Sequence, residues 1–232
     1  MLNIITSFKI SFFGRRAAAL AIALALMQTP TAQAATPTEA FVQRNIDQAY
    51  AILNNSVVSV EQRTENFRQL LVRIVDAKRI ARFTLGPYAR GASQAQIDNF
   101  ESVFSDFVAT VFQHEIAGSP GEKITVTNST VRAADDVIVA AKLTGSARSN
   151  APVDIAFRVR RAADGADSIL DLQVEGVWIA LAQREDFSNW LQQHHADISA
   201  LTAELKKHTE SMMDGITTAR NGAPKPTASA RP

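Results

Sequence analysis

Cysteine is absent from this 232-residue chain. Its absence excludes disulfide bonds, thiolate-bound metal sites and a cysteine nucleophile. It also excludes the lipid anchor of bacterial lipoproteins, which is attached to an N-terminal cysteine. An excess of positive charge is lacking too, because 24 lysines and arginines stand against 23 aspartates and glutamates. No basic patch therefore points to nucleic acid as a partner.

The N-terminal residues 1–34 predict a cleavable signal peptide. Three basic residues and no acidic residue accompany an uninterrupted apolar run at residues 17–27, AAALAIALALM. This run is shorter than the roughly 20 residues that a membrane-spanning helix needs. Small residues at Ala32 and Ala34 fit cleavage before Ala35. We therefore expect an exported, unanchored periplasmic protein whose 21 basic residues face 23 acidic ones once the leader is removed.

The rest of the chain is expected to form one domain and a tail. Residues 35–212 carry helical or strand periodicity throughout and contain no internal repeat. Residues 213–232 lack such periodicity and are expected to be a disordered C-terminal tail.

Helices are predicted at both ends of the domain. The first covers residues 36–55, and Ser59, Asp76 and Ser93 are expected to cap the next three. Two more are expected at residues 187–195 and 198–207. The helix after Ser93 has the widest apolar face, made of Ile97, Phe100, Val103, Phe104, Phe107, Val108, Val111 and Phe112.

Strands are predicted between these helices, because the apolar period changes from 3.6 to 2 at residue 123. Alternating segments cover residues 123–128, 137–143, 153–159 and 170–179, and Asp164-Gly165 is a hairpin turn signal. Short turns between strands favour an antiparallel sheet. The predicted fold class is α+β, with helices packed on one face of a twisted antiparallel sheet of about four strands.

Catalytic and metal-binding motifs are missing from the sequence. No pair of histidines has the spacing of metal ligands on one helix face, and neither a nucleophile elbow nor a phosphate-binding loop is present. Asp171 and Glu175 lie on one face of their predicted strand, which leaves open a small periplasmic enzyme that uses both carboxylates for acid–base chemistry. That hypothesis requires both carboxylates to face inward. No cofactor and no metal are expected.

Two stretches resemble a known family. The first is DAKRIARFTLG at residues 76–86, followed by the phenylalanine-rich helix. The second is LDLQVEGVWIALAQREDF at residues 170–187. In order and spacing both are similar to the toluene-tolerance family of periplasmic lipid-binding proteins, the MlaC type. The family commonly has serine where this chain has Trp178.

The resemblance implies a lipid carrier without catalytic residues. Such carriers hold phospholipid by its acyl chains in an apolar cavity and carry it between an inner-membrane ABC transporter complex and an outer-membrane lipoprotein complex, which supports outer-membrane lipid asymmetry. A branch of the family is linked to hopanoids, so a carrier of hopanoid or another polycyclic lipid is the alternative. Arg184 and Asp171 match family positions and are interpreted as structural or partner-facing.

Helix and strand faces of this kind fit either a solid core or the walls of a cavity, because both have the same periodicity. If a cavity exists, we expect it between the phenylalanine-rich helix and the sheet. The expected lipid-binding residues are Phe83, Leu85, Phe104, Phe107, Val108, Ile155, Phe157, Leu172, Val174 and Val177.

Overall fold

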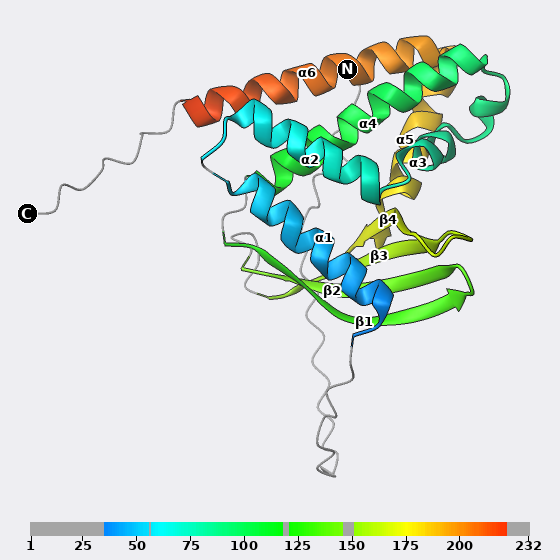
Figure 1. Ribbon diagram of the computed structural model, residues 1–232. Coiled ribbons are helices and arrows are strands. Elements are labelled where there is room, and N and C mark those ends of the chain that lie inside the picture. The colour runs from blue at the N-terminus through cyan, green and yellow to red at the C-terminus, as the bar shows by residue number, and fades with distance from the viewer. Residues whose placement is uncertain (1–34, 56, 118–120, 146–150, 222–232) are drawn as a thin grey trace, which may run out of the picture.

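The computed structural model describes residues 35–55, 57–117, 121–145 and 151–221. They form an α+β fold in which a layer of helices lies over one face of a five-stranded antiparallel sheet (Figure 1). The helices are α1 (Pro37–Leu53), α2 (Val60–Ile74), α3 (Ala77–Leu85), the 3₁₀ helix η2 (Gly86–Arg90), α4 (Gln94–Ala117), α5 (Ile179–Gln193) and α6 (Ile198–Asn221). The strands are β1 (Lys123–Ala133), β2 (Asp136–Thr144), β3 (Val153–Arg161), β4 (Asp167–Val174) and β5 (Val177–Trp178).

The predicted fold class is confirmed, with one strand more than expected. The strands lie in sequence order from β1 to β5, and each pairs antiparallel with the next. The turn at Asp164-Gly165 joins β3 to β4 as predicted, and Gly165 takes the left-handed backbone conformation that glycine tolerates, with φ of 83°. The predicted signal peptide, residues 1–34, lies outside the described residues.

Local capping signals place the starts of the early helices. The Thr36 hydroxyl accepts from the Glu39 backbone N–H, and the Glu39 carboxylate accepts from the Thr36 N–H, which is a complete capping box at α1. Ser93 and Gln96 make the same reciprocal pair before α4. Asp76 accepts from the Arg79 N–H and begins α3 as predicted.

The start of α5 differs from the prediction, which continued a strand to Ile179 and began the helix at Phe187. The strand instead stops at Val174, because Glu175 and Gly176 take positive φ angles of 49° and 87° and reverse the chain. Only the two residues of β5 follow before α5 begins at Ile179. Helix α5 therefore begins eight residues earlier than predicted, at Ile179 instead of Phe187.

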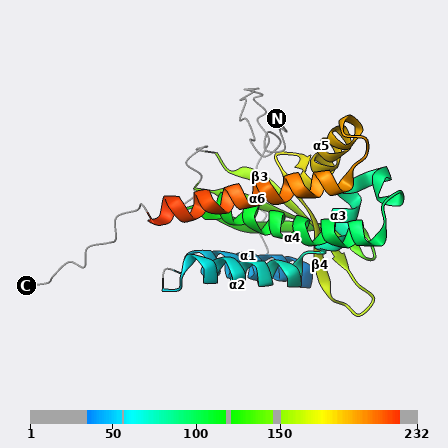
Figure 2. The ribbon, with the colours of Figure 1, turned by 90° about the horizontal axis from the view of Figure 1, so that it is seen from above.

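The last helix also differs from the prediction. Helix α6 runs to Asn221, so residues 213–221, which were expected to be disordered, are helical. The remaining tail, residues 222–232, lies outside the described residues. Figure 2 shows α6 beside α4, with α1 and α2 paired next to them. None of the helices within the described ranges is both long and apolar enough to cross a membrane.

Helix α1 covers the open edge of the sheet at β1. The Gln43 side chain accepts from the Val126 N–H at 2.8 Å and donates to the Ile124 carbonyl at 3.4 Å. These contacts occupy backbone groups of an edge strand that would otherwise be free to pair with another chain. Polar contacts at the edge therefore fix α1 over the sheet, where Val42 and Ile46 are buried.

Candidate functional site

The apolar core of the described residues is divided between two layers. The helical cluster consists of buried residues of α3 to α6: Ala81, Leu85, Ile97, Phe100, Phe104, Phe107, Val111, Phe187, Trp190, Leu191, Ile198, Leu201 and Leu205. The sheet cluster consists of buried residues of α1, β2 and β3: Val42, Ile46, Val139, Ala141, Ile155, Phe157 and Val159. The two clusters have no residue in common. Since most domains have one contiguous core, this division is unusual.

A smaller cluster around Phe67 and Leu70 of α2 lies beside the sheet cluster. It joins the sheet cluster, because Phe41 and Ile169 pack against both. It has no residue in common with the helical cluster, and Phe112 at the C-terminal part of α4 is its contact with that helix. Helix α4 finds its main neighbours in α6, α3 and α2, whereas α1 is the helix that packs on β1 and β2 (Figure 1). The buried phenylalanines of α4, Phe100, Phe104 and Phe107, and the apolar face of the sheet therefore belong to separate clusters.

The sheet register places all five strand residues of the predicted lining on one face. Phe157 pairs with Leu172, Ile155 pairs with Val174, and Val174 pairs with Val177. Directly opposed residues point to the same side of a sheet. This side carries the sheet cluster and faces α1, so these residues lie on the helix-facing side. Ile155 and Phe157 are buried, and Leu172 packs against them.

Most helix residues of the predicted lining lie in the helical cluster. Leu85, Phe104 and Phe107 are buried there, and Val108 packs against them. The Phe104 ring lies 6.3 Å from that of Phe107 and 6.4 Å from that of Phe187, measured between centroids. The structure thus divides the predicted residues between two apolar faces, one on each layer.

Two predicted residues lie at the surface. Phe83 is 40% exposed and Val177 is 54% exposed. The Arg184 guanidinium lies over the Phe83 ring, 5.0 Å from its centroid, in a cation–π contact. This contact joins α3 to α5 and is consistent with the structural one of the two roles, structural or partner-facing, in which Arg184 was interpreted from the sequence.

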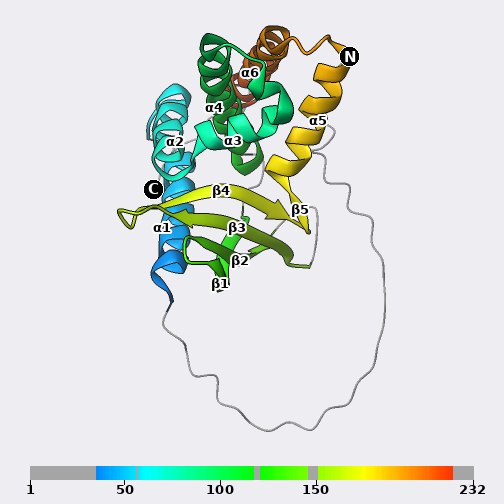
Figure 3. The same ribbon diagram turned by 90° about the vertical axis from the view of Figure 1, so that its right-hand side faces the viewer.

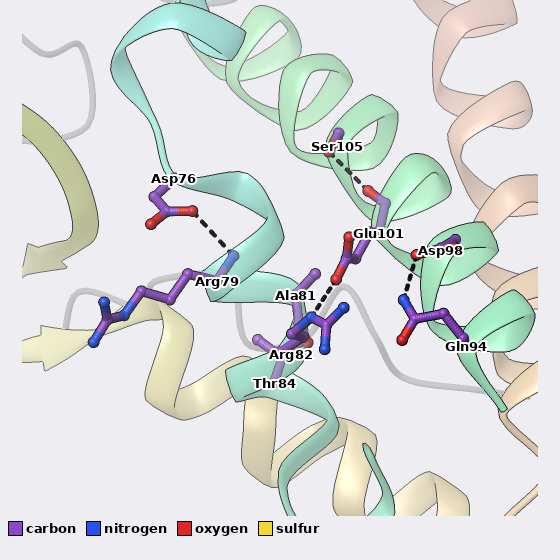
Figure 4. Close-up of polar contacts among 9 residues, drawn as sticks. All are labelled: Asp76, Arg79, Ala81, Arg82, Thr84, Gln94, Asp98, Glu101 and Ser105. Carbon is purple, nitrogen blue, oxygen red and sulfur yellow. Dashed lines mark hydrogen bonds and ion pairs between the residues drawn. The ribbon is translucent and has the colours of Figure 1, made fainter. Parts of the chain in front are cut away.

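An ion pair between a half-exposed arginine and a buried glutamate links α3 to α4 (Figure 4). Glu101 of α4 is 4% exposed, and Arg82 of α3 donates to its carboxylate from Nε at 2.5 Å. A carboxylate at this depth needs such a partner, because burial of an unpaired charge is costly. On the same short helix, Thr84 donates to the Ala81 carbonyl. The pair therefore holds Phe83 and Leu85 in place beside α4.

Gln183 is a buried polar residue that the sequence did not single out. It is 5% exposed, and its amide nitrogen Nε2 has no hydrogen-bond partner in the described part of the chain. A buried donor without a partner costs about 1–3 kcal/mol. The spacing of Ala180, Gln183 and Phe187 fits one helix face, and it could have indicated that Gln183 is buried. It could be recognised only with α5 starting at Ile179.

The enzyme hypothesis required Asp171 and Glu175 to face inward, and that prediction is wrong. Glu175 is exposed in the turn after β4. Asp171 pairs with Arg158, which lies on the opposite side of the sheet from the apolar face. Its carboxylate accepts from the backbone N–H groups of Leu172 and Ala180, so it caps the start of α5. Burial raises the pKa of Asp171, although these hydrogen bonds lower it in part.

A surface hollow of about 560 Å³ lies elsewhere, between α1 and α2. Ile52, Arg68, Val72 and Arg73 are among its lining residues, and none of the predicted lipid-binding residues belongs to it. Within the described ranges, no group of three or more His, Asp or Glu residues is arranged to hold a metal ion.

The fold and the site define a class: an α+β domain in which a helical layer and an antiparallel sheet face each other with separate apolar clusters. The chain belongs to the MlaC protein family, whose family model matches residues 43–207. The resemblance in the two motif-bearing stretches is therefore confirmed. A search of curated proteins finds none that matches this sequence.

Solved structures share the fold. One is a phospholipid-binding protein from Ralstonia solanacearum, determined in complex with a phospholipid. It superposes with a TM-score of 0.62 and is 17% identical, and the match covers 75% of this chain and 98% of that one. At this identity the similarity establishes a common fold.

Proposed function

We propose that this protein is a carrier that binds phospholipid acyl chains between its helical layer and its sheet. The observation that carries the proposal is the division of the core into a helical cluster and a sheet cluster with no residue in common. Family membership supports it, and so does the phospholipid held by a protein of the same fold.

The energetics of lipid transfer explain why a carrier needs two such faces. Exposing one methylene group to water costs about 0.8 kcal/mol, so a lipid with about 30 methylenes meets a barrier on the order of 20 kcal/mol. A carrier must cover nearly all of both chains. Two apolar layers can part to admit them without breaking sheet pairing or helix hydrogen bonds, because those bonds lie within each layer.

The proposed place of action is the periplasm. The expected signal peptide supports export, and the lack of cysteine excludes acylation as an anchor. We propose that the carrier moves between an inner-membrane ABC transporter complex and an outer-membrane lipoprotein complex, as the family resemblance implies, and so supports outer-membrane lipid asymmetry. Such a protein performs no chemical reaction, in agreement with the positions of Asp171 and Glu175.

Native mass spectrometry of protein purified from the periplasm tests lipid binding. We expect a bound mass equal to one phospholipid, which identification of the extracted lipid then assigns. Phe157→Asp places a charge on the sheet cluster and should reduce bound lipid at least tenfold. The matched control is Val131→Asp on β1, where the side chain is 70% exposed, and it should retain lipid.

Circular dichroism checks that each variant is folded, and Leu172→Asp at a half-buried position replaces Phe157→Asp if that variant unfolds. Wild-type protein that never carries lipid, even after incubation with phospholipid vesicles, would overturn the proposal. A polycyclic lipid in the extract would instead support the hopanoid alternative.

A further inference from the structure

Gln183 lies near the start of α5, where this helix leaves the sheet. Helix α5 rises from the end of the sheet at β5 toward α6 (Figure 3). Its buried residues are Ala180, Gln183, Phe187, Trp190 and Leu191. Residues four apart share a helix face, so Gln183 lies on the same face as Phe187 and one turn closer to the sheet.

Phe187 fixes the direction of that face. Its ring packs edge-on against Phe100, with 5.8 Å between centroids, and against Phe104. Both partners belong to the helical cluster. The side of α5 that carries Gln183 is therefore directed toward the helical cluster.

Four other buried polar side chains of the helices have partners for their donors. Thr84, Thr202 and Thr209 donate to carbonyl groups of the preceding turn. Gln113 of α4 donates from Nε2 to the Thr64 hydroxyl at 2.8 Å. Gln183 differs, because its amide nitrogen is without a partner in the same part of the chain. An apolar side chain of the same length would avoid the cost of this burial.

We propose that Gln183 donates a hydrogen bond to an acyl-ester carbonyl oxygen of the bound phospholipid. This inference rests on the proposed function. The ester carbonyls are the acceptors nearest the acyl chains, and a donor that is 95% buried can meet them without drawing the charged phosphate away from water. The same contact makes Gln183 a specificity residue, because it selects lipids with an acceptor next to the apolar part.

A pair of lipids that differ only in this acceptor tests the proposal. The probes are a short-chain diacyl phosphatidylcholine and its diether analogue, which has the same chain length and headgroup but no carbonyl. Wild-type protein should bind the diester about fivefold more tightly, as measured by isothermal titration calorimetry. Gln183→Met keeps the length of the side chain, removes the donor, and should bind both lipids equally.

Two further variants complete the experiment. Gln113→Met alters the other buried glutamine, whose amide nitrogen already donates to Thr64. This variant should keep the wild-type preference for the diester lipid. Gln183→Leu also removes the donor and should lose the preference, which covers a Gln183→Met variant that fails to fold. Thermal unfolding without lipid should give Gln183→Met a higher melting temperature than wild type.

The outcomes separate this proposal from the proposed function. Binding of both lipids with the same preference in wild type and in the Gln183 variants would overturn the role of Gln183 and leave the carrier intact. Wild-type protein that binds both lipids equally would do the same. Protein that binds neither lipid would overturn the carrier and the role of Gln183 together.

Discussion

Asp171 shows how one side chain can join two elements. Its carboxylate accepts from the Leu172 N–H at 2.8 Å and from the Ala180 N–H at 2.9 Å, and so joins β4 to the first turn of α5. Trp178 is the N-cap residue of α5 and makes no side-chain hydrogen bond there. The serine that the family commonly has at this position is a preferred capping residue. In this chain the capping group comes from the neighbouring strand.

The pKa of Asp171 leads to a prediction about pH. Because burial raises its pKa in the folded protein, the stability that this group contributes is fully present below its unfolded pKa, at about pH 4, and is lost as pH rises through the folded pKa. Asp171→Asn keeps an oxygen acceptor and cannot ionise. Its free energy of unfolding, relative to wild type, should therefore increase as pH rises through this window.

Urea unfolding of both proteins from pH 3 to pH 8 measures this difference. The comparison isolates Asp171 from carboxylates such as Asp136, whose pKa is lowered by Arg158 and whose effect has the opposite sign. A difference that falls with rising pH would mean that the hydrogen bonds from Leu172 and Ala180 outweigh burial.

Elements with strong local signals could be predicted from the sequence, and elements defined by tertiary contacts could not. Ser93 with Gln96 gave the start of α4, because a capping box is local. The alternation of apolar and polar residues in β3 predicted the correct sheet face for Ile155 and Phe157, because alternate side chains of a strand point to opposite faces of the sheet. The start of α5 was missed, since Glu175, a non-glycine residue, takes a positive φ and makes the turn.

The candidate site was predictable in part for the same reason. Periodicity identified the apolar faces, but the exposure of Phe83 depends on which neighbours cover it. Gln183 was missed because its significance depends on the absence of a partner for Nε2, which is a property of the packed structure. The sequence pattern predicts which face of a helix or strand a side chain occupies. The neighbours that it contacts on that face depend on the packing of the whole fold.

The C-terminal part of α6 gives a prediction at the scale of the element. Gly215 lies within α6 and is exposed, and a Cβ added there would meet no atom within 4 Å beyond the adjacent helix backbone. Glycine inside a helix costs up to about 1 kcal/mol relative to alanine, so Gly215→Ala should stabilise α6 and slow amide exchange there. Hydrogen exchange of residues 208–218 measures this effect.

Gly215→Pro is the matched opposite change and should accelerate exchange in the same segment, because proline removes a helix hydrogen bond. If neither variant changes exchange, the segment is not helical in solution, as the sequence pattern alone predicted. Met212 packs against the helical cluster, so a stabilised end of α6 should also protect that side of the core.

The whole molecule has two main apolar clusters, one in the helices and one on the sheet, and the proposed lipid would contact both. Without lipid, the helical cluster and the sheet cluster are separate, so the two layers should open with different free energies in native-state hydrogen exchange. A lipid that contacts both layers should slow exchange in α4 and in β3 together. At a lipid concentration one hundred times Kd, binding adds about 2.7 kcal/mol to the free energy of unfolding.

Exchange measured with and without a short-chain diacyl phospholipid below its micelle concentration tests this coupling. Phe157→Asp should abolish the joint protection, whereas Val131→Asp should preserve it. Protection confined to α1 and α2 would place the lipid in the hollow around Arg68 and Val72 and contradict binding between the layers. Joint protection of α4 and β3 that is lost in Phe157→Asp and kept in Val131→Asp is the result expected from a ligand that contacts both clusters.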